Sequence, residues 1–465
     1  MSAYQDFIAR KLASIPPTGL AAVPAFNPLT MKGHQRDLTT WALKRGRAAI
    51  FADTGLGKMR MELEWARLAG KRSIILAPLA VTKQLVAEAR AIGIDAIRAC
   101  RENSDAGDGI NVTNYDRLHK FDTSRFDAVA LDESSIIKHH DSKTLGQLMA
   151  AFSNTPMRLC ATATPSPNDY TELGTHAEFL GVCTQAEMLA EFFCHDGGET
   201  QVWRLKGHAR REFWRWVSQW GALVRKPSDL GYSDDGYDLP PYKMTHHTIA
   251  ASADTVKAAG LLFAAPAASL MERRAARKAS VNQRVAECAA RVNAHPNEPW
   301  IVWADLNSES QSLAKMIDGA VEVTGSQDAD TKEQLIADFI EGRARVLVSK
   351  PSICGFGSNF QHCARMSFVG VTDSWEAFYQ AMRRIWRFGQ KRLCEFDVYA
   401  SDVEGSVVAN LERKGVDAAK MAEELSRETR AAMRESVTGT VRATNAYAPR
   451  SIAFPEWIRT NRTEE

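Results

Sequence analysis

One stretch of the chain, residues 50–59, constrains the fold more than any other. An apolar run over residues 48–51 predicts a buried strand, and a glycine-containing loop follows it and ends at Lys58. An amphipathic helical pattern begins directly after this lysine. Strand, glycine loop, lysine and helix is the order of a phosphate-binding loop, in which backbone N–H groups and a helix N-terminus face the anion. The chain is therefore expected to bind a phosphate-containing ligand at the end of a parallel strand.

Within this loop, each residue type has an expected role. Glycine at positions 55 and 57 lets the backbone N–H groups point inward, because glycine tolerates positive φ. Lys58 supplies a positive charge for the β- and γ-phosphates. The next residue is normally Ser or Thr, whose hydroxyl binds Mg²⁺, and here it is Met59. The residues of the loop expected to hold the nucleotide are Thr54, Gly55, Leu56, Gly57, Lys58 and Met59.

A helical segment over residues 31–43 precedes the loop and carries one amide, Gln35. Two interpretations of this residue are open. It is either a solvent-facing helix glutamine or a side chain that contacts the adenine edge of a bound nucleotide.

Size and composition limit the class of protein. At 465 residues the chain exceeds the length at which one core usually divides, so two or three domains are expected. The formal net charge is only +2, so a polyanionic partner must bind a local basic patch. The eight cysteines include no C-x-x-C pair, which predicts reduced and mostly buried thiols. No apolar run approaches the ~20 residues that cross a bilayer, and we expect no signal peptide, no membrane contact and a cytoplasmic location.

From residue 48 to about residue 179, strand patterns alternate with helical patterns. The expected strands are 48–51, 73–77, 94–97, 110–112, 128–131 and 157–161. This alternation predicts right-handed βαβ units and a mainly parallel sheet with helices on both faces. Ligands of such sheets bind at the carboxyl ends of the strands.

Two polar clusters follow strands of this predicted sheet. Asp132 and Glu133 come directly after one strand, where Asp132 would hold Mg²⁺ and Glu133 would orient or deprotonate an attacking water. Such a pair alone is usually a turn, but a phosphate-binding loop in the same sheet favours the functional interpretation. Thr162 and Thr164 follow the next strand, and they either relay the state of the nucleotide to a neighbouring lobe or form an ordinary loop.

The alternation stops between about residues 183 and 296. Four tryptophans at positions 203, 214, 216 and 220 lie among several cationic residues that include Arg211 and Arg215. Aromatic rings interleaved with cations suit a nucleic-acid backbone. The alternative is an amphipathic helix with tryptophan in the core and arginine in solvent, and both interpretations remain open.

From residue 299 the alternation resumes and predicts a second α/β lobe. The expected strands are 300–303, 321–323, 345–348, 366–370 and 396–399, and the expected helices are 308–317, 331–342 and 376–386. A glycine loop over residues 352–359 follows one strand. Arg384 and Arg387, three residues apart, would share one helix face. Burial of these arginines would require an anion, which a γ-phosphate held by the first lobe would supply.

These clusters, in this order, resemble the superfamily-two helicases, and most closely their Swi/Snf-type DNA translocase branch. The resemblance covers residues 31 to about 400. The amino-acid sequence of several stretches is similar to that of small helicases of bacteriophage and prophage origin. The matching positions are Gln35 for the Q motif, residues 52–58 for motif I, Ala77 and Pro78 for motif Ia, residues 113–115 with Asn114 for motif Ib, residues 132–135 for motif II, Thr162 to Thr164 for motif III, Gly355, Gly357 and Asn359 for motif V, and Gln380 to Gln390 for motif VI. The segment Leu239 to Pro241 also resembles the Swi/Snf linker between lobes.

The resemblance implies an α/β fold of two RecA-like, doubly wound parallel-sheet lobes with a helical insertion or linker between them. The expected units are an N-terminal helix and connector (1–30), the first lobe (31–182), a helical basic and tryptophan-rich linker region (183–296), the second lobe (297–404), and a C-terminal helical segment with a polar tail (405–465).

The resemblance also implies the chemistry. ATP and Mg²⁺ would be bound by Lys58 and Asp132, Glu133 would be the base, and Arg384 and Arg387 would act as arginine fingers. Gln35, Gly357 and Gln380 would complete the nucleotide site. A nucleic-acid track, expected to be duplex DNA, would contact Pro78, Asn114, Thr162, Thr164, Arg211 and Arg215. A monomer in the cytoplasm of a bacterial or phage-infected cell is expected.

Two alternatives remain to the expected ATP-dependent movement on duplex DNA. Met59 in place of the hydroxyl residue favours a nucleotide-gated DNA clamp with little hydrolysis. An RNA helicase is the other alternative, and competition between duplex DNA and RNA would distinguish the two tracks.

Overall fold

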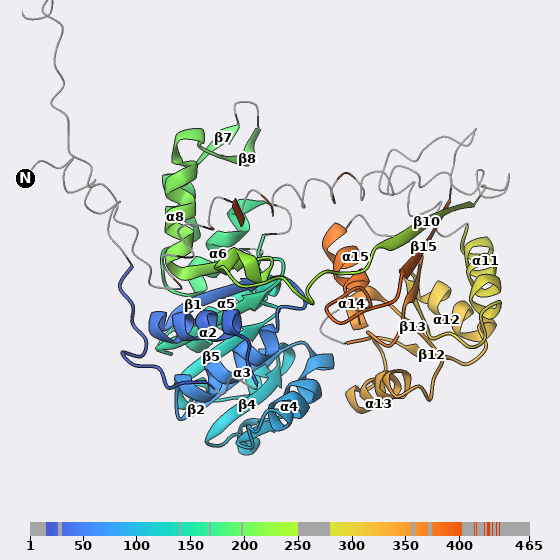
Figure 1. Ribbon diagram of the computed structural model, residues 1–465, viewed down its shortest axis with the longest axis horizontal. Helices are drawn as coiled ribbons and strands as arrows, with labels where there is room; N and C mark the ends of the chain where they lie inside the picture. The colour runs from blue at the N-terminus through green and yellow to red at the C-terminus, as the bar shows by residue number, and fades with distance from the viewer. Residues whose placement is uncertain are drawn as a thin grey trace, which may run out of the picture.

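The structure, a computed structural model, describes residues 15–26, 30–138, 140, 142–166, 169–196, 199–249, 280–354, 359–370 and 374–401, and eight single positions between 413 and 437. Within these residues lie two parallel sheets, each with its own helices (Figure 1). We call the body built on the seven-stranded sheet the first lobe and the body built on the six-stranded sheet the second lobe.

The first lobe's sheet has the order β3-β4-β2-β5-β6-β1-β9, and all of its strand pairs are parallel. The strands are β1 (Arg47–Ala52), β2 (Arg72–Ala77), β3 (Ile97–Ala99), β4 (Gly109–Asn114), β5 (Ala128–Asp132), β6 (Met157–Thr162) and β9 (Gly221–Val224). The central strands are apolar and buried because helices cover both faces of the sheet.

Helices pack on each face of this sheet. The helices are α2 (Gly33–Arg45), α3 (Lys58–Ala69), α4 (Thr82–Ala91), α5 (Lys143–Phe152), α6 (Leu173–Phe179), α7 (Gln185–Phe192) and α8 (Arg210–Trp220). Ile50 of β1 lies in a core cluster with α2, α3 and α4, whereas its neighbour Phe51 lies in a second cluster with α5, α6 and α8. Alternate residues of a strand point to opposite faces, so the sheet is doubly wound. An antiparallel hairpin of β7 (Phe193–Asp196) and β8 (Glu199–Leu205) lies beside α8 (Figure 1).

The second lobe repeats this plan. Its sheet has the order β10-β15-β14-β11-β13-β12, again with parallel pairs throughout. The strands are β10 (Tyr242–Ile249), β11 (Trp300–Ala304), β12 (Ala320–Val323), β13 (Val346–Ser349), β14 (Arg365–Val369) and β15 (Cys394–Ser401), and the helices are α11 (Val281–Asn293), α12 (Asn307–Met316), α13 (Ala329–Ile340), α14 (Pro351–Cys354) and α15 (Trp375–Met382). Trp300 and Trp303 of β11 belong to different core clusters, so helices cover both faces here as well.

The predicted fold class, two doubly wound parallel-sheet lobes, is confirmed. The sheets nevertheless extend into the region expected to be only a linker (183–296). β9 pairs with β1 at the edge of the first sheet, and β10 pairs with β15 at the edge of the second. The sequence pattern missed both strands because β9 has only four residues and β10 is largely exposed and polar.

Two predicted element boundaries differ from the structure, and the prediction for the cysteines is confirmed. The helix expected over 376–386 ends at Met382, so the arginines after it lie in turns rather than on one helix face. The strand expected over 94–97 begins only at Ile97. All eight cysteines are free and six are buried, as predicted. Among the described helices, none has both the length and the apolar character needed to cross a membrane.

Candidate functional site

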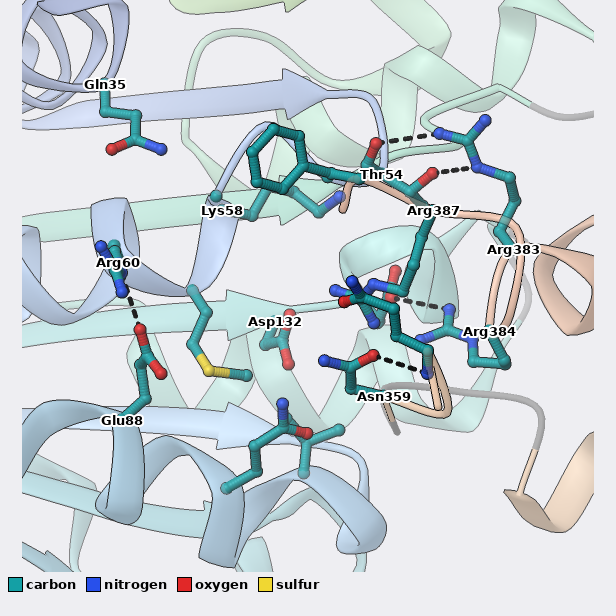
Figure 2. A pocket seen from close by; sticks show the side chains of 18 of the residues that line it. Gln35, Thr54, Lys58, Arg60, Glu88, Asp132, Asn359, Arg383, Arg384 and Arg387 are labelled. Atoms are coloured by element: carbon teal, nitrogen blue, oxygen red, sulfur yellow. Dashed lines mark hydrogen bonds and ion pairs between the residues drawn. The ribbon is translucent and has the colours of Figure 1, made fainter. Parts of the chain in front are cut away.

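A cavity of about 360 Å³ lies between the two lobes. This volume falls in the range of small-molecule sites, ~300–1,000 Å³. In Figure 2, Lys58 and Asp132 of the first lobe lie across from the three arginines of the second. The lining residues that carry the chemistry are Lys32, Gln35, Thr54, Gly55, Gly57, Lys58, Met59, Arg60, Glu88, Asp132, Glu133, Tyr237, Asn359, Arg383, Arg384, Arg387 and Phe388.

The loop between β1 and α3 has the backbone that the sequence predicted. Gly55 has φ +92° and Gly57 has φ +84°, both in the left-handed region that favours glycine. An ideal Cβ on Gly55 would lie 2.7 Å from the Cβ of Phe388, a residue of the second lobe. Lys58 Nζ donates to the carbonyl oxygen of Ala52 at 2.9 Å, so the lysine bonds to its own loop. The second lobe thus covers the loop at Gly55, and the Lys58 ammonium has a hydrogen-bond partner within the loop.

Gln35 is buried, so the interpretation of a solvent-facing glutamine is wrong. Its Nε2 donates to the carbonyl oxygen of Leu56 at 2.9 Å, and its Oε1 accepts from the backbone N–H of Lys32 at 2.9 Å. The amide therefore joins the first turn of α2 to the phosphate-binding loop while it lines the cavity. Leu56 itself lies in the hydrophobic core, so only its backbone is available to a ligand.

Asp132 and Glu133 lie at the carboxyl end of β5, and both are buried. Burial and then the charge of Glu133 raise the pKa of the Asp132 carboxyl to about 7, against the opposing charge of Lys58. Glu133 has φ +51°, and it is the only non-glycine residue with positive φ in the described ranges. Strained backbone of this kind gathers at functional sites, where the surrounding structure holds it in place.

Arginines from the turns after α15 extend toward the first lobe. Arg383 donates to the Thr54 hydroxyl and, at 2.9 Å, to the Thr54 carbonyl oxygen. Arg384 Nη2 lies 3.8 Å from Glu133 Oε1, and both side chains are buried. Burial, then the adjacent charges of Arg384 and Arg383, together lower the pKa of the half-buried Arg387 to about 10. Arg383 and Arg384 are buried beside the half-buried Arg387, and neighbouring cations of this kind are stabilised by a bound anion.

The charges around the cavity are unbalanced. Six cationic side chains line it against three carboxylates, which leaves an excess of three positive charges. One cation–carboxylate pair, Arg60 with Glu88 at 2.7 Å, is satisfied within the first lobe. The remaining excess lies between the phosphate-binding loop and the arginines, so the cavity is electrostatically suited to a polyphosphate.

The side-chain donors at the cavity suit Mg²⁺ only with the help of water and phosphate oxygens. No group of three His, Cys, Asp or Glu side chains in the described ranges is arranged to hold a metal by itself. Mg²⁺ usually takes one or two carboxylates and completes its shell with waters and substrate phosphates. Asp132 at the cavity wall fits that role, whereas Met59 offers no oxygen. A further buried carboxylate, Glu62, has both oxygens without a hydrogen-bond partner, so the donor set fits a cation near these residues.

Several predicted contacts are corrected. Thr162 is fully buried, accepts from the backbone N–H of Thr164 at 3.2 Å and lies 3.5 Å from Glu133 Oε2, so it does not face a nucleic acid. Gln380 does not line the cavity, because its Nε2 donates to Thr164 Oγ1 at 3.0 Å across the lobes. Thr164 is therefore in contact with the other lobe, and its part in a relay or in nucleic-acid binding stays a prediction.

For the other residues expected to contact nucleic acid, the structure gives a position and neighbours within the protein. Asn114 is buried, and its side chain accepts from the backbone N–H of Arg117 at 3.1 Å. Pro78 lies just after β2 and is half-buried. Gly357 and Gly355 lie outside the described residues, and Asn359 lines the cavity. The contacts of Pro78 and Asn114 with nucleic acid stay predictions.

The basic, tryptophan-rich stretch divides into two parts. Trp214 and Trp220 of α8 are buried in the core of the first lobe, which confirms the core interpretation for these two rings. Arg211 and Arg215 are exposed on the same helix. Their contact with nucleic acid stays a prediction, and it would involve phosphates rather than bases stacked on the two buried rings.

Sequence reasoning missed an aromatic group at the cavity. The rings of Tyr237 and Phe388 lie 4.8 Å apart between centroids, and Lys32 Nζ lies 4.5 Å from the first ring and 5.0 Å from the second. Both aromatic residues and Lys32 line the cavity beside Gln35. Tyr237 occurs in a turn-rich connector, where one aromatic residue gives no signal for a nucleotide site.

No protein-family model and no curated protein matches this sequence. Among solved structures, the chain is similar to the Sulfolobus solfataricus SWI2/SNF2 ATPase core in complex with dsDNA, with 15% identity and a TM-score of 0.40. The similarity covers 89% of this chain and 99% of that chain. At this identity and TM-score it carries no argument about activity, which rests instead on the geometry described above.

Proposed function

We propose that this chain is an ATP-dependent translocase of duplex DNA that hydrolyses ATP in the cavity between its lobes. The observation that carries the proposal is the phosphate-binding loop of one lobe facing buried arginines of the other. A site divided in this way binds the triphosphate fully only when the lobes are together. Hydrolysis and product release would then change the distance between the lobes.

The residues have distinct parts in the proposed reaction. Lys58 leaves the Ala52 carbonyl and binds the phosphates, together with the backbone N–H groups of the loop and of α3. Glu133 orients the attacking water and accepts its proton. Asp132 would hold Mg²⁺, which would neutralise charge on the β- and γ-phosphates.

The second lobe supplies the transition-state charge. Arg384, already beside Glu133, and Arg387 lie where the γ-phosphate would come between them and Lys58. Arginine fingers accelerate phosphoryl transfer by ~10³–10⁵. Arg383 instead binds Thr54 at the start of the loop and so senses the position of the first lobe. The side of the cavity formed by Tyr237, Phe388 and Gln35 is suited to the adenine ring of ATP.

The proposal is tested by measuring ATPase rates with and without duplex DNA. Wild type is expected to be stimulated by DNA, and Glu133→Gln is expected to bind ATP but not turn it over. Glu187→Gln is the matched control, because Glu187 caps the start of α7 with an exposed side chain. Absence of DNA stimulation, or full turnover by Glu133→Gln, would refute the proposal. Competing duplex RNA in the same assay separates a DNA track from an RNA track.

A DNA clamp with little hydrolysis is the second candidate, because Met59 lines the cavity where an oxygen ligand is normally found. In that case Met59→Thr should switch on turnover. Wild-type turnover as fast as that of the variant would exclude the clamp.

A further inference from the structure

A buried carboxylate on α3 has no partner in the protein. Glu62 is 1% exposed, and neither of its oxygens has a hydrogen-bond partner in the described structure. An unpaired buried polar group is costly, and an ionised one more so. A position of this kind is normally apolar, as Met61, Leu63 and Trp65 around it are. Something outside the described chain is therefore expected to satisfy it.

The other buried acid of the same helix is satisfied. Glu64 is also buried, and its Oε2 lies 2.6 Å from Arg67 Nη2 one turn later. Glu62 has no such cation within α3. The difference between the two acids shows that α3 can pair a buried carboxylate and does not pair this one.

The position of Glu62 points to the nucleotide site. It lies four residues after Lys58 and three after Met59 in α3, and these spacings share one helix face. The charged groups that act on it are Asp132, Lys58 and Glu133, and burial together with the two acids raises the pKa of its carboxyl well above the usual range. α3 packs directly on β5, the strand that carries Asp132. Glu62 is thus a third acid beside the two that were predicted.

We propose that Glu62 is an outer-sphere carboxylate of the Mg²⁺ site, where it accepts a hydrogen bond from a metal-bound water. This water would occupy the coordination position that a Ser or Thr hydroxyl takes when it follows the loop lysine, and that Met59 cannot fill. The proposal rests on the proposed function, because it assumes a nucleotide bound with Mg²⁺ in the cavity.

Glu62 is set back from the cavity wall, which disfavours direct coordination of the metal. Asp132 and Met59 line the cavity, whereas Glu62 does not. The described residues also form no ready three-ligand cluster that includes Glu62. Mg²⁺ retains several waters in protein sites, and residues that hold those waters tune metal affinity.

The test measures binding rather than turnover. The Kd of a fluorescent non-hydrolysable ATP analogue is measured for the full chain with Mg²⁺ and with EDTA, and the ratio gives the gain from the metal. Glu62→Gln is expected to reduce this gain by ~10-fold, the lower end of outer-shell effects. Glu64→Gln on the same helix is the control and should keep the wild-type gain. Met59→Thr combined with Glu62→Gln should restore the gain, because a hydroxyl ligand then makes the water unnecessary.

The outcomes separate this inference from the proposed function. If wild type does not bind the analogue in either condition, the proposed function fails. If wild type binds it but Mg²⁺ gives no gain, or if Glu62→Gln keeps the full gain, Glu62 has no part in the metal site. Equal losses in Glu62→Gln and Glu64→Gln would trace the effect to the helix and also overturn the proposal. Thermal unfolding checks that each variant folds, and Glu62→Gln is expected to be no less stable than wild type.

Discussion

Because Gly55 contacts Phe388 of the other lobe, a single substitution at Gly55 is expected to disfavour closure of the lobes. In Gly55→Ala the new Cβ would lie 2.7 Å from the Phe388 Cβ and 3.2 Å from its backbone nitrogen, against a preferred carbon–carbon separation of ~3.5–4.0 Å. Rotating the phenyl ring does not relieve this contact, because the atoms involved are the Cβ and the backbone. Overpacking of this kind costs ~1–3 kcal/mol, which would shift the closed-to-open ratio by about 5–150-fold.

The same substitution also strains the loop itself. An alanine at φ +92° costs ~1–2 kcal/mol whether the lobes are open or closed. Gly93→Ala isolates this second effect, because Gly93 has φ +83° and nothing within 4 Å of its Cβ position. Both variants should lose a similar free energy of unfolding in urea, and only Gly55→Ala should favour the open arrangement.

Small-angle X-ray scattering measures the opening through the radius of gyration, and binding of a non-hydrolysable ATP analogue measures its effect on the divided site. Gly55→Ala is expected to be more extended and to bind the analogue more weakly than Gly93→Ala. Equal radii and equal affinities in the two variants would refute the argument that Phe388 rests on this loop when the lobes are together.

Three other perturbations test other parts of the site. Asp132→Asn should raise the melting temperature more at pH 8 than at pH 5. The Asp132 carboxyl has a pKa of about 7 in the folded protein, so between these pH values it binds more protons in the folded than in the unfolded state, and wild-type stability falls as pH rises. An equal change in melting temperature at both pH values would contradict this prediction. Arg384→Ala should lower DNA-stimulated turnover by ~10³-fold while nucleotide is still bound, and a loss below tenfold would remove it as a finger. Charge reversal of Arg211 and Arg215 should weaken DNA binding and reduce its salt slope by ~2 without changing the melting temperature, and unchanged affinity at low salt would leave α8 a purely structural helix.

Most of the parallel sheet was predictable from local pattern. β1, β2, β5, β6 and β11 are apolar runs because helices cover both of their faces, and the sequence displays this burial directly. Edge strands such as β10 lack a continuous apolar run, so the sequence does not reveal them. β10 is half polar and exposed, and its place in the second sheet depends on pairing with β15, about 150 residues later in the chain.

The candidate site was predictable where chemistry follows a strand or loop end. Lys58, Asp132 and Glu133 line the cavity because carboxyl ends of parallel strands meet at one edge. Gln380 was misassigned because its contact with Thr164 joins residues 216 positions apart, which no local pattern shows. The shared helix face expected for Arg384 and Arg387 was wrong because a continuous helix to residue 386 was assumed. The helix ends at Met382, and Arg383 in the turn after it donates to the Thr54 carbonyl oxygen. Glu62 gave no signal at all, since an acid within an amphipathic helix normally faces solvent.

The path of the chain between the lobes has a mechanical consequence. β9 ends beside the nucleotide loop, where the Asp53 N–H bonds to the Val224 carbonyl oxygen at 2.9 Å, and the chain then runs to β10 at the edge of the other sheet. A force that separates the lobes would load β9 and β10 through this connecting segment. Tension in this tether is therefore delivered next to the first residue of the phosphate-binding loop. If the chain has the proposed translocase activity, its nucleotide affinity is expected to depend on the tension in this tether.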